Sequence, residues 1–251
     1  MIIKNDLDIQ KLRHVGGIVA RCLQHMTEQA RAGMTLKELD QIGAKFLAQS
    51  GARSAPILTY DFPGHTCLSV APIVAHGIPN DTVLKDGDLL NIDVSAEKDG
   101  YFGDTGGSFF IGTANAAGDL LLKATREALD EAMKVARAGA KINKIGQRIQ
   151  AVAERYRFEI IENLGSHGVG KGLHEEPKFI PSYFDEDDKR VLKKGQVITI
   201  EPFLATKSCF VDELEDGWSL IADDGGLSAQ FEHTMIITDG MPLIMTDPKN
   251  L

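Results

Sequence analysis

The chain has 251 residues, of which 43% are hydrophobic, and a formal net charge of -9. This length allows one compact domain with a sizeable core, and the interspersed, net negative charge argues against nucleic acid as the main ligand. The three cysteines lie far apart and form no C-x-x-C pair, so neither a disulfide framework nor a zinc knuckle is expected and a reducing cytoplasm fits best.

The first half of the chain begins with two predicted helices. The N-terminus carries charges and lacks a long apolar core, so neither a signal peptide nor a membrane span is expected there. Residues 7–33 place apolar side chains at three- and four-residue spacing and end on glycine, which predicts an amphipathic helix, and a second helix is predicted in residues 35–51. Residues 119–156 have the same design.

Two pairs of similar segments indicate an internal repeat. "ARAGMTLKEL" from Ala30 resembles "ARAGAKINKI" from Ala136, an offset of 106 residues, and "LKDGDLLNID" resembles "LKKGQVITIE" at an offset of 108. Near-equal offsets predict a single domain over residues 1–251, with half-repeats at about 8–112 and 116–240, each a helix pair followed by antiparallel strands. The alternative is that helix and strand junctions resemble each other by composition alone.

A hairpin is predicted around the turn-forming letters "EKDG". If its turn is centred between Lys98 and Asp99, Asp93 and Asp104 lie directly opposite each other on neighbouring strands. A two-residue turn at Asp99 and Gly100 would shift this register. Like charges opposite each other destabilise a hairpin, so we expect a cation between the two aspartates.

The stretch "GSHGVGKGLHEEP", residues 165–177, looks at first like a phosphate-binding loop. Gly172 stands where such a loop needs Ser or Thr, and the prolines that follow predict irregular chain instead of a helix. Nucleotide binding is therefore not expected, and Lys171 is interpreted as a solvated loop charge. His167 and His174 then need another explanation.

Two further acids interrupt apolar strand patterns, Glu201 and Glu232. Together with Asp93, Asp104 and His167 they form a set of four oxygen ligands and one nitrogen ligand, which suits catalytic Mn, Fe, Co or Zn. One divalent ion would leave a buried charge of -2, whereas two divalent ions balance four carboxylates. The set therefore favours two ions that share carboxylates and acidify a water between them.

Five motifs closely resemble those of the methionine aminopeptidases, in order and over nearly the whole chain: "VAHGIPN", "NIDVSAEKDGYFGDTGGSF", "GSHGVGKGLHEEP", "TIEPF" and "SAQFEHTMIIT". The resemblance implies the pita-bread α/β (α+β) fold, in which two pseudo-two-fold-related halves of helices pack on a curved antiparallel sheet around a dinuclear metal site. It also implies removal of the initiator methionine from nascent polypeptides when the second residue is small.

Position by position, the resemblance implies metal ligation by Asp93, Asp104, His167, Glu201 and Glu232. Glu201 is also expected to act as the base, His174 to stabilise the oxyanion, and His76 to orient the scissile amide or serve the leaving group. The resemblance places the methionine side chain among Phe62, Cys67, Leu173 and Trp218, although members of the family commonly have Tyr or Phe where Leu173 stands.

Two other functions are considered. Prolidase-like and proline-specific aminopeptidases resemble this fold but carry an additional N-terminal domain, for which the roughly ninety residues before Asp93 leave no room. A non-catalytic binding protein of this fold would lack the ligand set. Only 27 residues separate His174 from Glu201, which indicates the short bacterial-type form. We expect a cytoplasmic monomer that acts on nascent chains, associates transiently with ribosomes and has no membrane partner.

Overall fold

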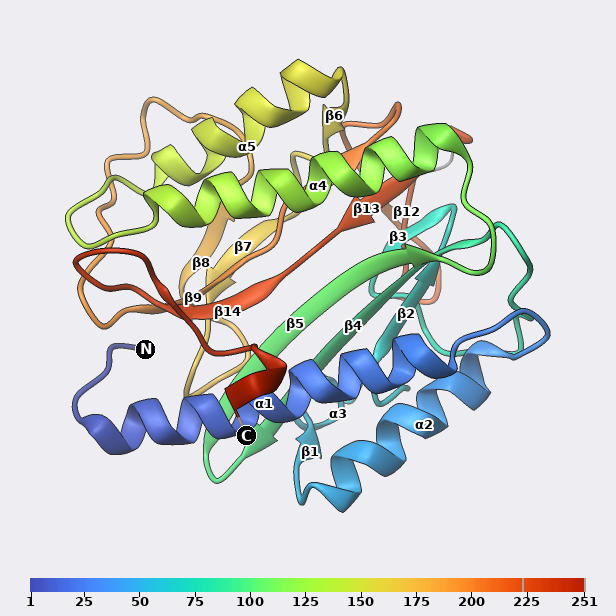
Figure 1. Ribbon diagram of the computed structural model, residues 1–251, viewed down its shortest axis with the longest axis horizontal. Helices are drawn as coiled ribbons and strands as arrows, with labels where there is room; N and C mark the ends of the chain where they lie inside the picture. The colour runs from blue at the N-terminus through green and yellow to red at the C-terminus, as the bar shows by residue number, and fades with distance from the viewer. Residues whose placement is uncertain (223, 251) are drawn as a thin grey trace.

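The computed structural model describes residues 1–222 and 224–250. Its strands lie between two pairs of helices, one pair on each outer side (Figure 1). The helices are α1 (Asp6–Gln29), α2 (Leu36–Gln49), α3 (Ala55–Tyr60), α4 (Ala116–Val135), α5 (Asn143–Tyr156) and the 3-10 helix η1 (Pro248–Asn250). The two helix pairs confirm the predicted amphipathic segments. Among the described residues, no helix is long and apolar enough to cross a membrane.

The helices of the first pair begin at side-chain caps. Asn5 accepts a hydrogen bond from the backbone N–H of Asp8 at the start of α1. Thr35 and Glu38 form a reciprocal capping box at the start of α2. These bonds occupy backbone donors that a helix leaves unpaired in its first turn, so the positions at which both helices begin follow from local sequence.

The strands form four antiparallel groups. In the first, β4 pairs with β1, β2 and β5; the others run β15-β14-β9-β7-β8, β13-β10-β6 and β11-β12-β3. The strands are β1 (Arg53–Ser54), β2 (Cys67–Val70), β3 (Ile73–Ala75), β4 (Leu89–Lys98), β5 (Tyr101–Phe110), β6 (Glu159–Ile160), β7 (Gly165–Gly168), β8 (Glu175–Pro181), β9 (Val197–Ile200), β10 (Phe203–Ala205), β11 (Asp212–Glu213), β12 (Leu220–Ile221), β13 (Ser228–Gln230), β14 (His233–Ile236) and β15 (Leu243–Ile244).

Each helix pair packs on its own hydrophobic core. Buried residues of α1 and α2 pack against the even-numbered residues of β4, Leu90, Ile92, Val94 and Ala96. Those of α4 and α5 pack against Ile198 and Ile200 of β9. Because side chains alternate across a strand, the odd-numbered positions of β4, including Asp93, face away from the first core.

The two larger sheets meet where β5 lies beside residues 231–236. The backbone N–H of Glu232 donates to the carbonyl of Gly106, and the Thr234 hydroxyl donates to the carbonyl of Asp104. Strand β14 therefore approaches β5 in space (Figure 1). The half-repeats at about residues 8–112 and 116–240 stay a prediction.

The hairpin register differs from the predicted one. Asp99 and Gly100 form a two-residue turn, both with positive φ, so Asp93 pairs with Gly106 and Asp104 pairs with Ser95. The prediction that the two aspartates lie directly opposite each other was wrong. They are diagonal neighbours on the same face, because a shift of two residues keeps the side of the sheet unchanged. The turn residues decided this register, since a two-residue loop needs left-handed backbone at both positions.

Candidate active site

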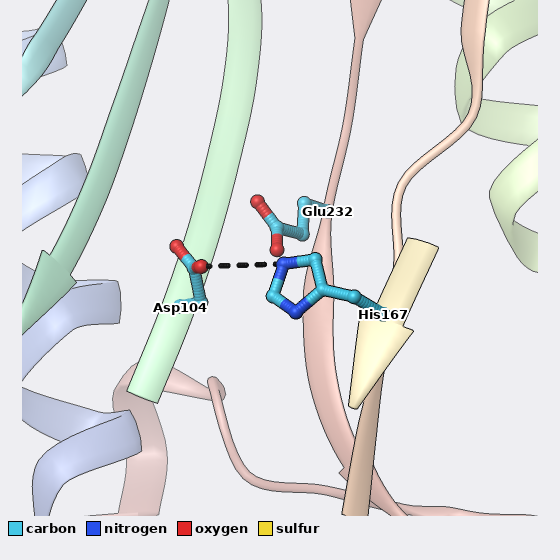
Figure 2. Close-up of side chains that lie close together, drawn as sticks. All are labelled: Asp104, His167 and Glu232. Carbon is cyan, nitrogen blue, oxygen red and sulfur yellow. Dashed lines mark ion pairs between the residues drawn. The ribbon is translucent and has the colours of Figure 1, made fainter. Parts of the chain in front are cut away.

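Three buried side chains from separate segments of the chain converge between the two halves. Asp104 comes from β5, His167 from β7, and Glu232 from the short segment that separates β13 from β14 (Figure 2). One ligand atom from each lies within 4.8 Å of the others. Their side chains are almost fully buried, with the whole residues 6%, 5% and 2% exposed. The stretch "SAQFEHTMIIT", residues 228–238, whose apolar pattern predicts one strand, is thus divided at Glu232 into β13 and β14.

Asp93 and Glu201 extend this cluster. Glu201 follows the last residue of β9, and its Oε1 lies 3.3 Å from Nε2 of His167. The carboxyl group of Asp93 is within hydrogen-bonding reach of that of Asp104. The structure therefore brings together all five residues that the sequence analysis named as metal ligands.

His167 presents an unprotonated nitrogen to the acids. Its Nδ1 lies 3.0 Å from the carbonyl oxygen of Gly168, which can only accept, so Nδ1 carries the hydrogen. Desolvation lowers the pKa of His167 to about 3, so the ring is neutral near pH 7. The lone pair on Nε2 then faces Glu201 and, at 3.7 Å, Asp104. This contact is favourable only with a cation or a proton between the groups.

The environment of the carboxyl groups also favours a bound cation. Desolvation and mutual repulsion hold the pKa values of Asp104, Glu201 and Glu232 well above their ordinary values, and desolvation raises that of Asp93 to about 6. Asp104 Oδ1 and Glu232 Oε1 are buried without a hydrogen-bond partner among the described residues. These unpaired carboxylate oxygens, together with the lone pair of the His167 ring, fit a divalent cation that accepts oxygen and nitrogen ligands.

Hydrogen bonds around the cluster orient two of the acids, and sequence analysis missed them. Thr199 Oγ1 donates to Glu201 Oε1 at 3.0 Å, and Gln230 Nε2 donates to Glu232 Oε2 at 3.1 Å. Asn91 Nδ2 in turn donates to Gln230 Oε1. Both partners stand two residues before the acid that they hold, so the period of a strand could have revealed them.

A pocket of about 360 Å³ opens onto the cluster. The four residues assigned to the methionine side chain, Phe62, Cys67, Leu173 and Trp218, all line it. The rings of Phe62 and Trp218 meet edge to face with their centroids 5.1 Å apart. These walls are apolar and end at the buried acids, so the pocket can hold an apolar side chain beside a polar centre.

Both predicted non-ligand histidines, His76 and His174, line the same pocket. His76 has a left-handed backbone with φ of 53°, and a side chain at the following Gly77 would meet the Leu68 carbonyl oxygen at 2.2 Å. Such a conformation is uncommon for a residue other than glycine and occurs at functional sites. Desolvation lowers the pKa of both histidines, that of His174 to about 4.

Two neighbours of His174 were not found from the sequence. Tyr60 Oη lies 2.6 Å from His174 Nδ1, and Lys178 Nζ donates to the His174 carbonyl at 2.7 Å. Both Tyr60 and Lys178 line the pocket. Nothing in the local pattern of Tyr60 signals this role, because its partner is 114 residues away.

The glycine-rich stretch lacks the helix of a phosphate-binding loop. After Gly172 the chain enters strand β8, where irregular chain was predicted. The ammonium group of Lys171 lies over the ring of Tyr101, 3.1 Å from its centroid. The interpretation of this lysine as a solvated charge was therefore incomplete, since it also makes a cation–π contact.

Comparison with known proteins identifies the family. The profile of metallopeptidase family M24 matches residues 10–239. A methionine aminopeptidase of Staphylococcus epidermidis is 43% identical over 98% of this chain and 98% of its own. The chain belongs to metallopeptidase family M24, among the methionine aminopeptidases. Membership confirms the resemblance drawn from the five motifs and the expectation of a metal-dependent hydrolase.

Solved structures agree with this placement. The methionine aminopeptidase of Rickettsia prowazekii superposes with a TM-score of 0.93 at 34% identity, over 98% of this chain and 100% of that one. The prolidase of Pyrococcus furiosus reaches a TM-score of 0.79 at 24% identity, over 98% of this chain and 65% of that chain. The second likeness shows the fold alone. The predicted pita-bread fold is confirmed.

Proposed function

We propose that the protein removes the N-terminal methionine from nascent polypeptides whose second residue is small. One observation carries the proposal: a buried cluster of four acids and one neutral histidine closes the end of an apolar pocket. The names of the full-length relatives support the same substrate.

The metal-binding residues in this proposal are Asp93, Asp104, His167, Glu201 and Glu232. Four carboxylates are neutralised by two divalent cations, and the O₄N donor set suits Co, Mn, Fe or Zn. Bound ions of this kind lower the pKa of water and polarise a carbonyl group. Thr199 and Gln230 hold two of the acids in the orientation that ligation requires.

Three side chains act on the substrate. Glu201 accepts the proton of the attacking water, because its carboxylate borders both the cluster and the pocket. His174 donates a hydrogen bond to the oxygen of the first peptide carbonyl as negative charge develops on it. His76 orients the scissile amide nitrogen or serves the leaving amine.

Methionine is selected by the apolar walls of the pocket. An unbranched thioether can adapt to the wall that the contacting rings of Phe62 and Trp218 form, and can make sulfur–aromatic contacts with it. Leu173 and Cys67 complete the lining. The preference for a small second residue is carried over from the resemblance to the methionine aminopeptidases, whose five motifs this chain shares.

We also propose that the enzyme works in the cytoplasm as a monomer and contacts ribosomes transiently. Three free thiols, two of them buried, are consistent with a reducing compartment. Light scattering of the isolated protein tests whether it is a monomer. Cosedimentation with ribosomes at low salt tests the contact with ribosomes.

The proposed reaction is tested with purified protein reconstituted with Mn, Co or Fe. Met-Ala-Ser should be cleaved to free methionine and Ala-Ser, whereas Met-Leu-Ser should be cleaved far more slowly. Ala-Ala-Ser serves as a control for methionine selectivity and Ala-Pro-Ser for a proline-specific enzyme. Comparable rates on Met-Ala-Ser and Met-Leu-Ser would contradict the second-residue rule, and preferential cleavage of Ala-Pro-Ser would replace the proposal.

A further inference from the structure

One hydrogen bond joins His174 to the other half of the molecule. Tyr60 Oη and His174 Nδ1 lie 2.6 Å apart. Tyr60 ends α3, whose N-terminal cap, Ser54, belongs to β1 and pairs with Ala96 of β4. Helix α3 is therefore anchored beside β4, the strand that carries Asp93.

The phenol O–H is the stronger donor of this pair, and the tautomer of His174 sets which group donates. A neutral imidazole has one N–H and one nitrogen lone pair, and that lone pair accepts more strongly than a phenol oxygen. Desolvation also raises the pKa of Tyr60, so its hydroxyl keeps the proton near pH 7. When Tyr60 donates to Nδ1, the hydrogen of the His174 ring must reside on Nε2.

The other contacts of His174 leave Nε2 available. Lys178 holds its backbone through the carbonyl, and the His167 ring packs against it with centroids 4.1 Å apart. Within residues 1–222 and 224–250, no hydrogen bond occupies Nε2 of His174. A ring fixed at Nδ1 and packed on one side has a single remaining donor, which can meet a substrate oxygen in the pocket.

We propose that Tyr60 is a positioning residue: its hydroxyl selects the tautomer of His174 that donates from Nε2 and holds the ring in place for the substrate carbonyl. This inference rests on the proposed function, since it concerns how His174 reaches the reacting carbonyl. Tyr60 is 44% exposed, so removal of its hydroxyl leaves no buried donor in the fold and tests the role without unfolding the protein.

The first test replaces Tyr60 by phenylalanine. Tyr60→Phe should lower kcat on Met-Ala-Ser about tenfold, the lower end of the cost of removing a partner that orients a functional histidine. KM should change less than about twofold, because the affected bond strengthens mainly in the transition state. Tyr156→Phe is the matched control, since its hydroxyl also donates to a side chain, Glu127, at 2.7 Å. It lies at the end of α5, outside the pocket, and should leave kcat unchanged.

The second test asks whether Tyr60 acts through His174. Tyr60→Phe should have no further effect on kcat in a His174→Ala background, which a merely structural role would not predict. Nitrogen-15 NMR of the metal-free protein should show His174 with its hydrogen on Nε2, and Tyr60→Phe should alter the Nδ1 signal. Unchanged kcat in Tyr60→Phe, an additive loss in the double variant, or a hydrogen on Nδ1 would overturn the inference.

These outcomes are separable from failure of the proposed function. A wild-type enzyme that cleaves no peptide beginning with methionine would reject that function. The tautomer measurement on metal-free protein would still decide what Tyr60 does to His174.

Discussion

The two histidines of the glycine-rich stretch should respond differently to removal. His167 offers its Nε2 lone pair to the acid cluster, so His167→Ala should weaken metal binding. His174 packs against His167 but is bonded through Nδ1 to Tyr60, which leaves it one donor for the substrate. His174→Ala should therefore bind metal nearly normally and lose catalysis.

The expected loss follows from the number of hydrogen bonds removed. Loss of one oxyanion donor typically lowers kcat by about a hundredfold to a thousandfold, or about 2.7–4 kcal/mol. His174 has one nitrogen left for that role, so its removal should cost about this much and no more. KM should change much less, because the bond strengthens mainly in the transition state. His174→Gln retains an N–H donor and should recover part of the rate.

Calorimetric metal titration beside steady-state kinetics on Met-Ala-Ser measures both quantities for each variant. The wild-type titration serves as the reference, and circular dichroism checks that both alanine variants fold. A His174→Ala enzyme that binds no metal, or one that turns over normally, would refute the assignment. So would a His167→Ala enzyme with unchanged metal affinity.

Three further results are expected. Chelator-treated protein should be inactive and regain activity with Mn, Co or Fe, whereas Glu232→Ala should stay inactive; full activity of that variant under saturating metal would argue against two metal ions. Asp40 is 4% exposed and accepts hydrogen bonds from the backbone of His65 and from both the backbone and the hydroxyl of Thr66. Asp40→Ala should lower the urea-derived stability by about 2–4 kcal/mol and raise KM, since the loop it holds carries Phe62; unchanged KM would show that the loop does not depend on this carboxylate.

Local sequence was sufficient for much of the fold. The apolar spacing of residues 7–33 and 35–51 predicted α1 and α2, because a helix period is visible within a few turns. Acids within apolar strand patterns pointed to the residues of the acid cluster for a similar reason. Leu90 and Ile92 need a core, and an acid such as Asp93 at an alternate position needs a partner on the other face.

Turn geometry and breaks in strands were harder to predict from the sequence. The placement of Asp93 and Asp104 depended on whether Asp99 and Gly100 formed the whole turn, and the letters "EKDG" allow either register. Glu232 was predicted within one strand, yet it lies between β13 and β14. Its N–H bonds to Gly106 of β5, a residue of the other half, so the break depends on a contact that no local pattern encodes.

The sequence by itself determined which side chains are available for chemistry, since residue type and strand period are local properties. Tertiary structure alone decided how they are oriented. The hydrogen on Nδ1 of His167 follows from a backbone carbonyl, and the hydrogen bond of His174 comes from a tyrosine 114 residues earlier. These orientations arise only when the two halves pack together, because a hydrogen bond depends on distances that the spacing of residues along the chain does not specify.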